Sequence, residues 1–150
     1  MQYANKLLHL LMKDGKKTKA HSLLQKTFQR LNVESKKNTQ LDQPTFLLLE
    51  EAVSNVKPFF GLQKSRLGGV TIQLPVTLPE ARQNNIALRW ILQAARKNQK
   101  ANAKKGASFD FFLSQEILNA AQRQGEAFKK RNELHKIAES NRGFLRRRSR

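Results

Sequence analysis

The sequence predicts a mainly α-helical protein whose six-helix body carries one protruding, two-stranded β-hairpin arm. Apolar residues recur at helical spacing in six segments, and between the third and fourth segments the period of the pattern changes to two. Gly68 and Gly69 lie within this period-two region and suit a tight hairpin turn. The length of 150 residues fits one domain. We therefore expect a single helical domain over residues 1–141, with the arm at about 59–78 and an Arg-rich tail at 142–150.

The first two helices are expected at 2–13 and 17–31, where leucines and alanines form one apolar stripe on each segment. The first ends at Asp14-Gly15, because glycine readily takes the left-handed conformation that terminates helices. The polar stretch 32–40 then reads as a loop.

A third helix is expected to run to about Lys57, with Asp42 as a candidate N-cap and Pro44 in its first turn. Pro58 ends it. The residues expected to be buried on its inner face are Phe46, Leu49, Val53 and Val56.

The hairpin is predicted from two alternating runs on either side of the glycine pair. In the second run Val70, Ile72, Leu74 and Val76 alternate with mostly polar residues, so we expect this apolar face to pack. Pro75 cannot donate a ladder hydrogen bond, which makes this an edge strand. A lone ribbon is marginal in water, so a binding partner would add rigidity to the arm.

Three more helices are expected at 82–98, 109–124 and about 126–140, with a basic loop at 98–108 and a stop at Gly125. The apolar stripe of the fourth helix includes Trp90, which we expect to be a core residue. The residues expected to face inward on the last helix are Ala127, Leu134, Ile137 and Ala138.

The charge of the chain indicates a polyanionic partner. Lys and Arg number 29 against 11 Asp and Glu, a formal net charge of +18. A compact domain with this excess repels itself unless a polyanion neutralises it, which favours nucleic acid or an anionic membrane. The apolar stripes suit mutual packing of the helices, so we expect no membrane partner. The absence of cysteine excludes disulfides and zinc knuckles.

The sequence shows no residue pattern typical of an enzyme active site. His9, His21 and His135 are scattered, with no metal-binding spacing, and no glycine-rich loop precedes a helix. Glu50 and Glu51 are adjacent on a helix and cannot face one site. We expect no catalytic site, no metal and no cofactor.

The basic residues form separate clusters that indicate nucleic-acid binding. Any single cluster could be an ordinary solvated helix face, but several together with few acids between them favour contacts to phosphates. Arg82, Arg89 and Arg96 lie seven residues apart and share one face of a helix. The candidate contact residues are Lys16, Lys17, Lys64, Arg66, Arg82, Arg89, Arg96, Lys97, Lys129, Lys130, Arg131 and Arg142.

RNA is favoured over DNA because the chain shows no helix-turn-helix, zinc finger or basic zipper. A helical body with an extended ribbon and a basic tail suits irregular, folded RNA. The alternative is a general, nucleoid-like nucleic-acid-binding protein, since such proteins also use basic ribbons.

Four blocks of the sequence resemble ribosomal protein seven of the bacterial-type small subunit. The resemblance covers nearly the whole chain, and the order of the blocks makes it specific. The blocks are 11–17 (LMKDGKK); 55–58 (NVKP) with 64–69 (KSRLGG) and 73–76 (QLPV); 87–91 (ALRWI) with 94–97 (AARK); and 129–131 (KKR) with His135, Ala138, Glu139 and Asn141.

The resemblance implies a structural component of the small subunit that binds the head (3′ major) domain of its ribosomal RNA and nucleates assembly of the head. It also implies a position near the exit-site tRNA and the mRNA, with contacts to ribosomal proteins nine and eleven. The candidate contact residues would carry these RNA interactions, block by block.

Several departures from the bacterial pattern suggest a mitochondrial ribosome over a bacterial or plastid one. The basic N-terminal arm is absent, Gln83 stands where arginine is usual, and the loop 98–108 is longer. The run 144–148 (FLRRR) replaces an aromatic finish, and its arginines are expected to substitute for the missing arm.

Overall fold

The computed structural model describes residues 2–37, 43–102 and 106–144. Within these ranges the chain forms six α-helices, one two-stranded antiparallel sheet and a short 3-10 helix, which confirms the expected fold class. In chain order the elements are α1 (Gln2–Leu11), α2 (Lys17–Lys37), α3 (Thr45–Val56), β1 (Phe60–Leu67), β2 (Val70–Thr77), α4 (Glu80–Ala101), α5 (Phe109–Ala121), α6 (Gly125–Ser140) and η3 (Arg142–Phe144).

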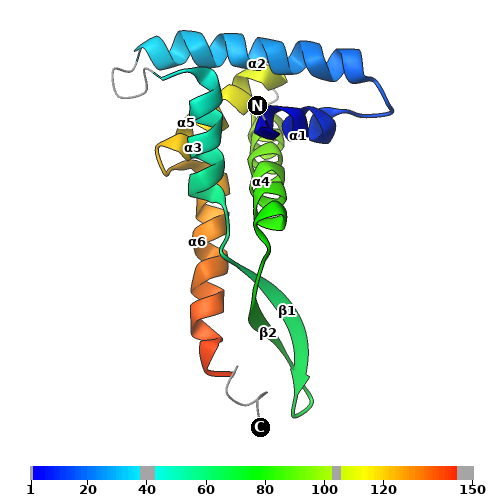
Figure 1. The fold of residues 1–150 in the computed structure, drawn as a ribbon, viewed down its shortest axis with the longest axis vertical. Helices are drawn as coiled ribbons and strands as arrows, with labels where there is room; N and C mark the ends of the chain where they lie inside the picture. The colour runs from blue at the N-terminus through cyan, green and yellow to red at the C-terminus, as the bar shows by residue number, and fades with distance from the viewer. Residues whose placement is uncertain (1, 38–42, 103–105, 145–150) are drawn as a thin grey trace.

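The helices form a body from which the hairpin projects at one end (Figure 1). α2 lies across the opposite end, whereas α3, α4 and α6 run toward the hairpin. α5 packs against α2, α3, α4 and α6 and so occupies the centre of the body. Fully buried side chains from five helices meet in the core, among them Leu7, Leu31, Leu49, Leu88, Ile91, Leu113 and Ile117.

The turn between α1 and α2 follows the sequence prediction. Asp14 and Gly15 have φ angles of 55° and 70°, the left-handed conformation expected at this turn. α1 ends at Leu11, two residues before its predicted end. α2, however, extends six residues beyond its predicted end at residue 31, so the loop prediction is wrong for 32–37. The extension is polar but packs: Ser35 is buried, and Gln115 of α5 donates a hydrogen bond to Glu34.

The start of α5 is fixed by a buried carboxylate. Asp110 is buried and accepts hydrogen bonds from Arg30 of α2 and from Ser108. Burial raises the pKa of Asp110, but the two hydrogen bonds and the positive charge of Arg30 outweigh this effect, so its pKa lies below the ordinary value.

The second half of the chain departs from prediction at the helix ends. α4 continues to Ala101, so the expected loop is helical over 98–101. α5 ends at Ala121 rather than 124, and Arg123 takes a left-handed φ of 59°. Gly125, expected to stop a helix, is instead the first residue of α6, with a φ of 91°.

The hairpin has the predicted turn. Leu67 pairs with Val70 across the two-residue turn Gly68-Gly69, whose φ angles of 58° and 83° require glycine-like freedom at both positions. The predicted apolar face packs only in part, since Leu74 is fully buried and Ile72 half-buried, whereas Val70 and Val76 are exposed. The ribbon contacts α6 and η3, and its turn lies at the end away from the other helices (Figure 1).

Four further core predictions need correction. Phe46 is 56% exposed and Ile137 40% exposed, because α3 and α6 turn other residues toward the core. Trp90 packs against the core but is only partly buried, as is Leu134. The predicted N-cap Asp42 lies outside the described residues. Among the helices that are described, none combines the length and apolar character that crossing a bilayer requires.

Candidate nucleic-acid interface

One face of α4 carries most of the basic residues of that helix. At 100° per residue, Arg82, Arg89, Arg96, Lys97 and Lys100 all fall within about 60° of Gln93, on the side opposite the buried residues. The arginines are exposed and, within the part of the chain that the structure describes, make no salt bridge.

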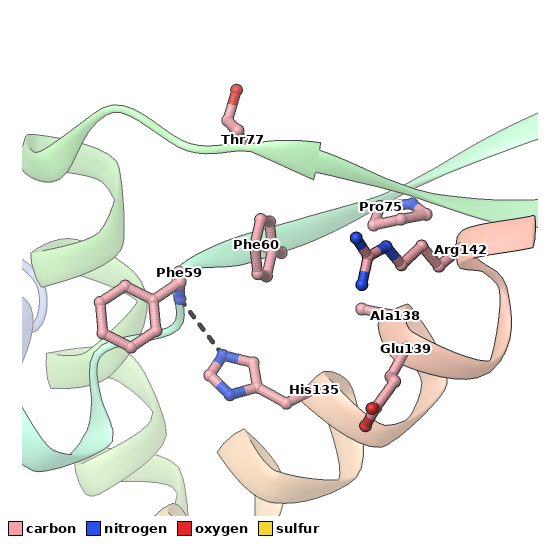
Figure 2. A pocket seen from close by; sticks show the side chains of 8 residues that line it. All are labelled: Phe59, Phe60, Pro75, Thr77, His135, Ala138, Glu139 and Arg142. Carbon is pink, nitrogen blue, oxygen red and sulfur yellow. Dashed lines mark hydrogen bonds between the residues drawn. The ribbon is translucent and has the colours of Figure 1, made fainter. Parts of the chain in front are cut away.

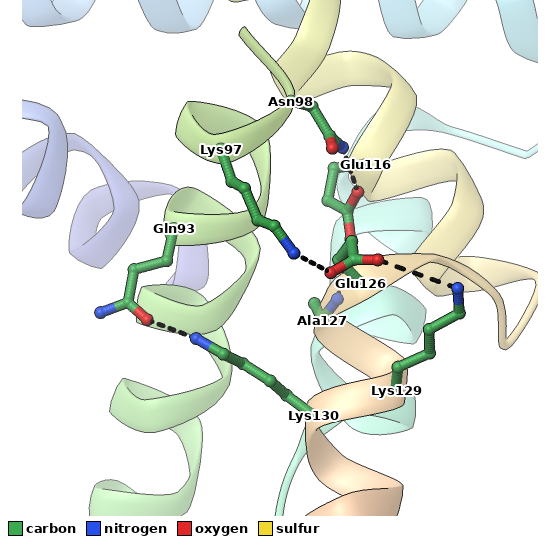
Figure 3. Close-up of polar contacts among 8 residues, drawn as sticks. All are labelled: Gln93, Lys97, Asn98, Glu116, Glu126, Ala127, Lys129 and Lys130. Atoms are coloured by element: carbon green, nitrogen blue, oxygen red, sulfur yellow. Dashed lines mark hydrogen bonds and ion pairs between the residues drawn. The ribbon is translucent and has the colours of Figure 1, made fainter. Parts of the chain in front are cut away.

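α6 extends this face, because its first turns lie beside α4 (Figure 3). Lys130 Nζ donates to Gln93 Oε1 at 3.0 Å. Glu126 lies between two lysines, with its oxygens 2.7 Å from Lys97 Nζ and 3.8 Å from Lys129 Nζ. We call this surface the α4–α6 face; it comprises Arg82, Arg89, Arg96, Lys97, Lys100, Lys129 and Lys130.

Glu126 is a counterion within this basic surface. Its hydrogen bond and charge attraction raise the pKa of Lys97, and the same contacts lower the pKa of Glu126. The groups are largely exposed, so the pair adds little to stability. It joins Lys97 of α4 to the first turn of α6.

A buried carboxylate fixes α6 against α4 and α5. Glu116 of α5 is 1% exposed, and its Oε1 accepts a hydrogen bond from the Ala127 backbone N–H at 3.0 Å. Its Oε2 accepts one from Asn98 of α4 at 3.3 Å (Figure 3). Burial raises the pKa of Glu116 above its usual value, and these hydrogen bonds only partly offset that effect.

Arg131 does not join Lys129 and Lys130 on this surface, because at about 100° per residue it lies about 160° around the helix from Lys129. Its guanidinium lies over the rings of Phe59 and Phe128, at 5.9 and 5.4 Å from their centroids. Burial, and then the charge of Arg123, lowers its pKa. Arg131 therefore packs the base of the hairpin against α6.

The hairpin and the body place the other candidate residues apart. Lys64 and Arg66 are exposed on β1 and lie on the same side of the ribbon as their partners Gln73 and Thr71. We call this side of the ribbon, which carries Lys64, Arg66, Thr71 and Gln73, the hairpin face. Arg142 lies in η3 beside the hairpin base (Figure 2).

Lys16 and Lys17 lie far from the hairpin, at the turn between α1 and α2 (Figure 1). The structure thus brings together the basic residues of α4 and α6, and separates them from Lys16 and Lys17.

Lys100 was missed in the sequence because the helix was expected to end at residue 98. Once α4 is seen to reach Ala101, Lys100 continues the spacing set by Arg89, Gln93 and Arg96. Phe59 and Phe60, which are exposed, were not among the predicted site residues.

The three histidines do not come together in one site. His9 and His21 are exposed, and His135 Nε2 accepts a hydrogen bond from the Phe59 backbone N–H at 3.2 Å. In the described ranges, no three His, Cys, Asp or Glu side chains come together as metal ligands would.

Comparison with known proteins identifies the family. A mitochondrion-type relative from Marchantia polymorpha, small ribosomal subunit protein uS7m, is 41% identical over 95% of this chain and 58% of its own length. Small ribosomal subunit protein uS7 of Thermosipho africanus is 36% identical, and that of Dichelobacter nodosus 38%, each over 93% of this chain and 83% and 81% of its own length. Residues 1–142 match the family described as ribosomal protein S7p/S5e. The chain therefore belongs to the ribosomal protein S7p/S5e family, whose members are structural proteins of the small ribosomal subunit.

Proposed function

We propose that this chain binds the head (3′ major) domain of small-subunit ribosomal RNA through the α4–α6 face and the hairpin face, and that it nucleates assembly of the head. The observation that carries the proposal is the continuous run of exposed cations along α4, extended by Lys129 and Lys130. Residues 1–141 act as one RNA-binding unit, and the Arg-rich run 142–150 adds further positive charge.

The spacing of the arginines suits a charged, irregular RNA surface. Seven helical residues rise about 10.5 Å, so Arg82, Arg89 and Arg96 stand about one Debye length apart at physiological salt. At this distance their mutual repulsion is largely screened, and each can meet a different phosphate. Because such contacts carry no sequence information, the shape of the RNA must supply selectivity.

The hairpin tip is proposed to lie near the exit-site tRNA and the mRNA. Gly68, Gly69 and Val70 are exposed and lie at the far end of the ribbon from the body. Ribosomal proteins nine and eleven are proposed neighbours on the basis of the family resemblance.

A mitochondrial ribosome is our proposed location. The chain is 41% identical to the Marchantia uS7m protein and 36% and 38% identical to the two bacterial relatives, and the higher identity to uS7m supports this location.

The test is the salt dependence of RNA binding by matched charge-removal variants. If six to ten phosphates are neutralised, affinity for the head-domain RNA should fall by about three to five decades between 50 and 200 mM salt. The double variant Arg89→Gln, Arg96→Gln should lower the slope of log affinity against log salt by about two.

The control removes the same charge from α2, as Lys26→Gln with Lys36→Gln, since both lysines are exposed and lie outside the two proposed faces. Filter binding of the purified full chain measures both variants. A flat salt response of the unchanged chain, or an equal loss in both double variants, would contradict the proposal.

A further inference from the structure

A groove separates the base of the hairpin from the end of α6. It has a volume of about 620 Å³, within the range of small-ligand sites. The residues that shape it are Phe59, Phe60 and Pro75 on the hairpin side and His135, Ala138 and Arg142 on the other (Figure 2).

The two phenylalanines that line this groove are exposed. Phe59 is 53% exposed and Phe60 43% exposed, although both are consecutive aromatic residues in a chain with a well-formed core. Burying an aromatic ring is strongly favourable, so two adjacent rings left open at a groove indicate a surface that a partner covers.

The exposed rings are held in place. Phe59 stacks on the His135 imidazole with the ring centroids 5.8 Å apart, and Phe60 meets the same imidazole edge-on at 6.3 Å. The Phe59 backbone N–H donates to His135 Nε2, which must be unprotonated to accept it. Burial, followed by the charge of Arg131, lowers the pKa of His135 and favours this neutral form at neutral pH.

A positively charged side chain, that of Arg142, also lines the groove. The Arg142 side chain reaches over Ala138 toward Phe60 and Pro75 (Figure 2). Its backbone is tied to the hairpin, because the neighbouring Asn141 donates a hydrogen bond from Nδ2 to the Gln73 carbonyl at 2.8 Å. Glu139 also lines the groove, but its carboxylate lies on the side away from the hairpin.

The groove continues into the hairpin face. Phe60, Lys64 and Arg66 share one side of β1, since alternate residues of a strand point the same way. At about 3.4 Å per residue, Lys64 and Arg66 lie roughly 14 and 20 Å beyond Phe60. Aromatic rings at one end of a strand and cations along it are the arrangement that binds single-stranded nucleic acid.

We propose that the groove holds one unpaired nucleobase of the bound RNA, stacked on Phe59 or Phe60, with the adjacent phosphate on Arg142 and the strand continuing along the hairpin face. The proposal deepens the RNA-binding function above and rests on it. The net charge of +18 and the cation at the groove favour a nucleotide over an apolar peptide as the occupant.

The test compares two oligomers with the same backbone charge. One is a ten-nucleotide oligouridine, and the other is the same strand with every base removed. Stacking of one base should make the full chain bind oligouridine about 5- to 150-fold more tightly than the abasic strand at equal salt. Phe59→Leu with Phe60→Leu, which keeps apolar volume but removes both aromatic rings, should abolish most of this ratio.

Phe46→Leu is the matched control, because Phe46 is equally exposed but lies on α3, away from the groove. It should preserve the ratio, and circular dichroism should show that every variant is folded. Phe60→Tyr, which retains a stacking ring, should keep more of the ratio than Phe60→Leu.

Each contrary outcome has a distinct meaning. Equal binding of the two oligomers by the unchanged chain overturns the base pocket, even where head-domain RNA still binds with the expected salt slope. If the unchanged chain fails to bind head-domain RNA, the proposed function is overturned. That binding is measured separately from the oligomer ratio. If the leucine variant keeps the ratio but loses contact with a neighbouring ribosomal protein, the groove holds protein and the proposal is wrong.

Discussion

Gly125→Ala should destabilise the protein more than its backbone angle alone requires. Gly125 has a φ of +91° and sits where α6 approaches α5. A Cβ at this position would lie 2.8 Å from Glu116 Oε1 and 3.1 Å from Asn119 Cβ. The buried carboxylate would have to move, and its hydrogen bond with the Ala127 backbone N–H would be lost or distorted.

The expected loss has two parts. A left-handed backbone costs a residue with a Cβ about 1–2 kcal/mol. A hydrogen bond to a charged group contributes about 1.5–3 kcal/mol. Together they lower the free energy of unfolding by about 2.5–5 kcal/mol, which corresponds to a fall in Tm of roughly 5–20 °C for a domain of this size.

Gly15→Ala is the control, since Gly15 has a φ of +70° with nothing within 4 Å of its Cβ position. It should lose only about 1–2 kcal/mol. Urea unfolding followed by circular dichroism measures both variants. Equal losses would show that the Glu116 carboxylate moves aside freely, contrary to expectation. In a Glu116→Ala background the cost of Gly125→Ala should drop toward that of Gly15→Ala.

Two further predictions concern the arm and the charge of a buried residue. Shortening the turn across residues 67–70 should leave incorporation into small subunits nearly intact but alter tRNA retention at the exit site, because Gly68, Gly69 and Val70 are exposed. Lys129→Ala with Lys130→Ala should instead impair incorporation and leave tRNA retention nearly unchanged. Sedimentation measures incorporation, and a shortened turn that by itself blocks incorporation would refute this assignment of separate roles to the tip and the body. Asp110→Asn should lose more stability at pH 7 than at pH 2–3. The pKa of Asp110 is depressed in the folded state, so its contribution is present above the unfolded pKa of about 3.9 and is lost as pH falls through the folded value. A loss that does not change with pH, measured by urea unfolding, would contradict it.

Local signals in the sequence predict the order of the elements. The change of period locates the hairpin, and Gly68-Gly69 supplies the φ angles of its turn. Asp14-Gly15 locates the turn between α1 and α2, although α1 itself ends at Leu11. These features depend on neighbouring residues alone, which is why the sequence suffices.

Tertiary packing determines what the sequence does not predict. Residues 32–37 and 98–101 are mostly polar, and they are helical because α5 offers partners such as Gln115 and Glu116. Neither contact has a local signature. The exposure of Phe46 likewise depends on how α3 is rotated in the body.

The candidate surface was partly predictable for the same reason. The seven-residue spacing of the arginines on α4 is visible in the sequence and places them on one face. The packing of Arg131 on Phe59 is not visible, because it joins α6 to a residue 72 positions earlier. The groove beside Phe59 depends on the same long-range contact.

Both ends of α6 are fixed, at Glu116 near its start and through Asn141 to Gln73 beyond its end. The helix therefore joins the body and the arm over about 24 Å as a rigid spacer. For an RNA that meets both surfaces, the protein is a bivalent ligand, and the second contact forms at an effective concentration on the order of millimolar. Two modest contacts can then give tight attachment, while the arm can release and rebind its part of the RNA without the protein leaving the particle.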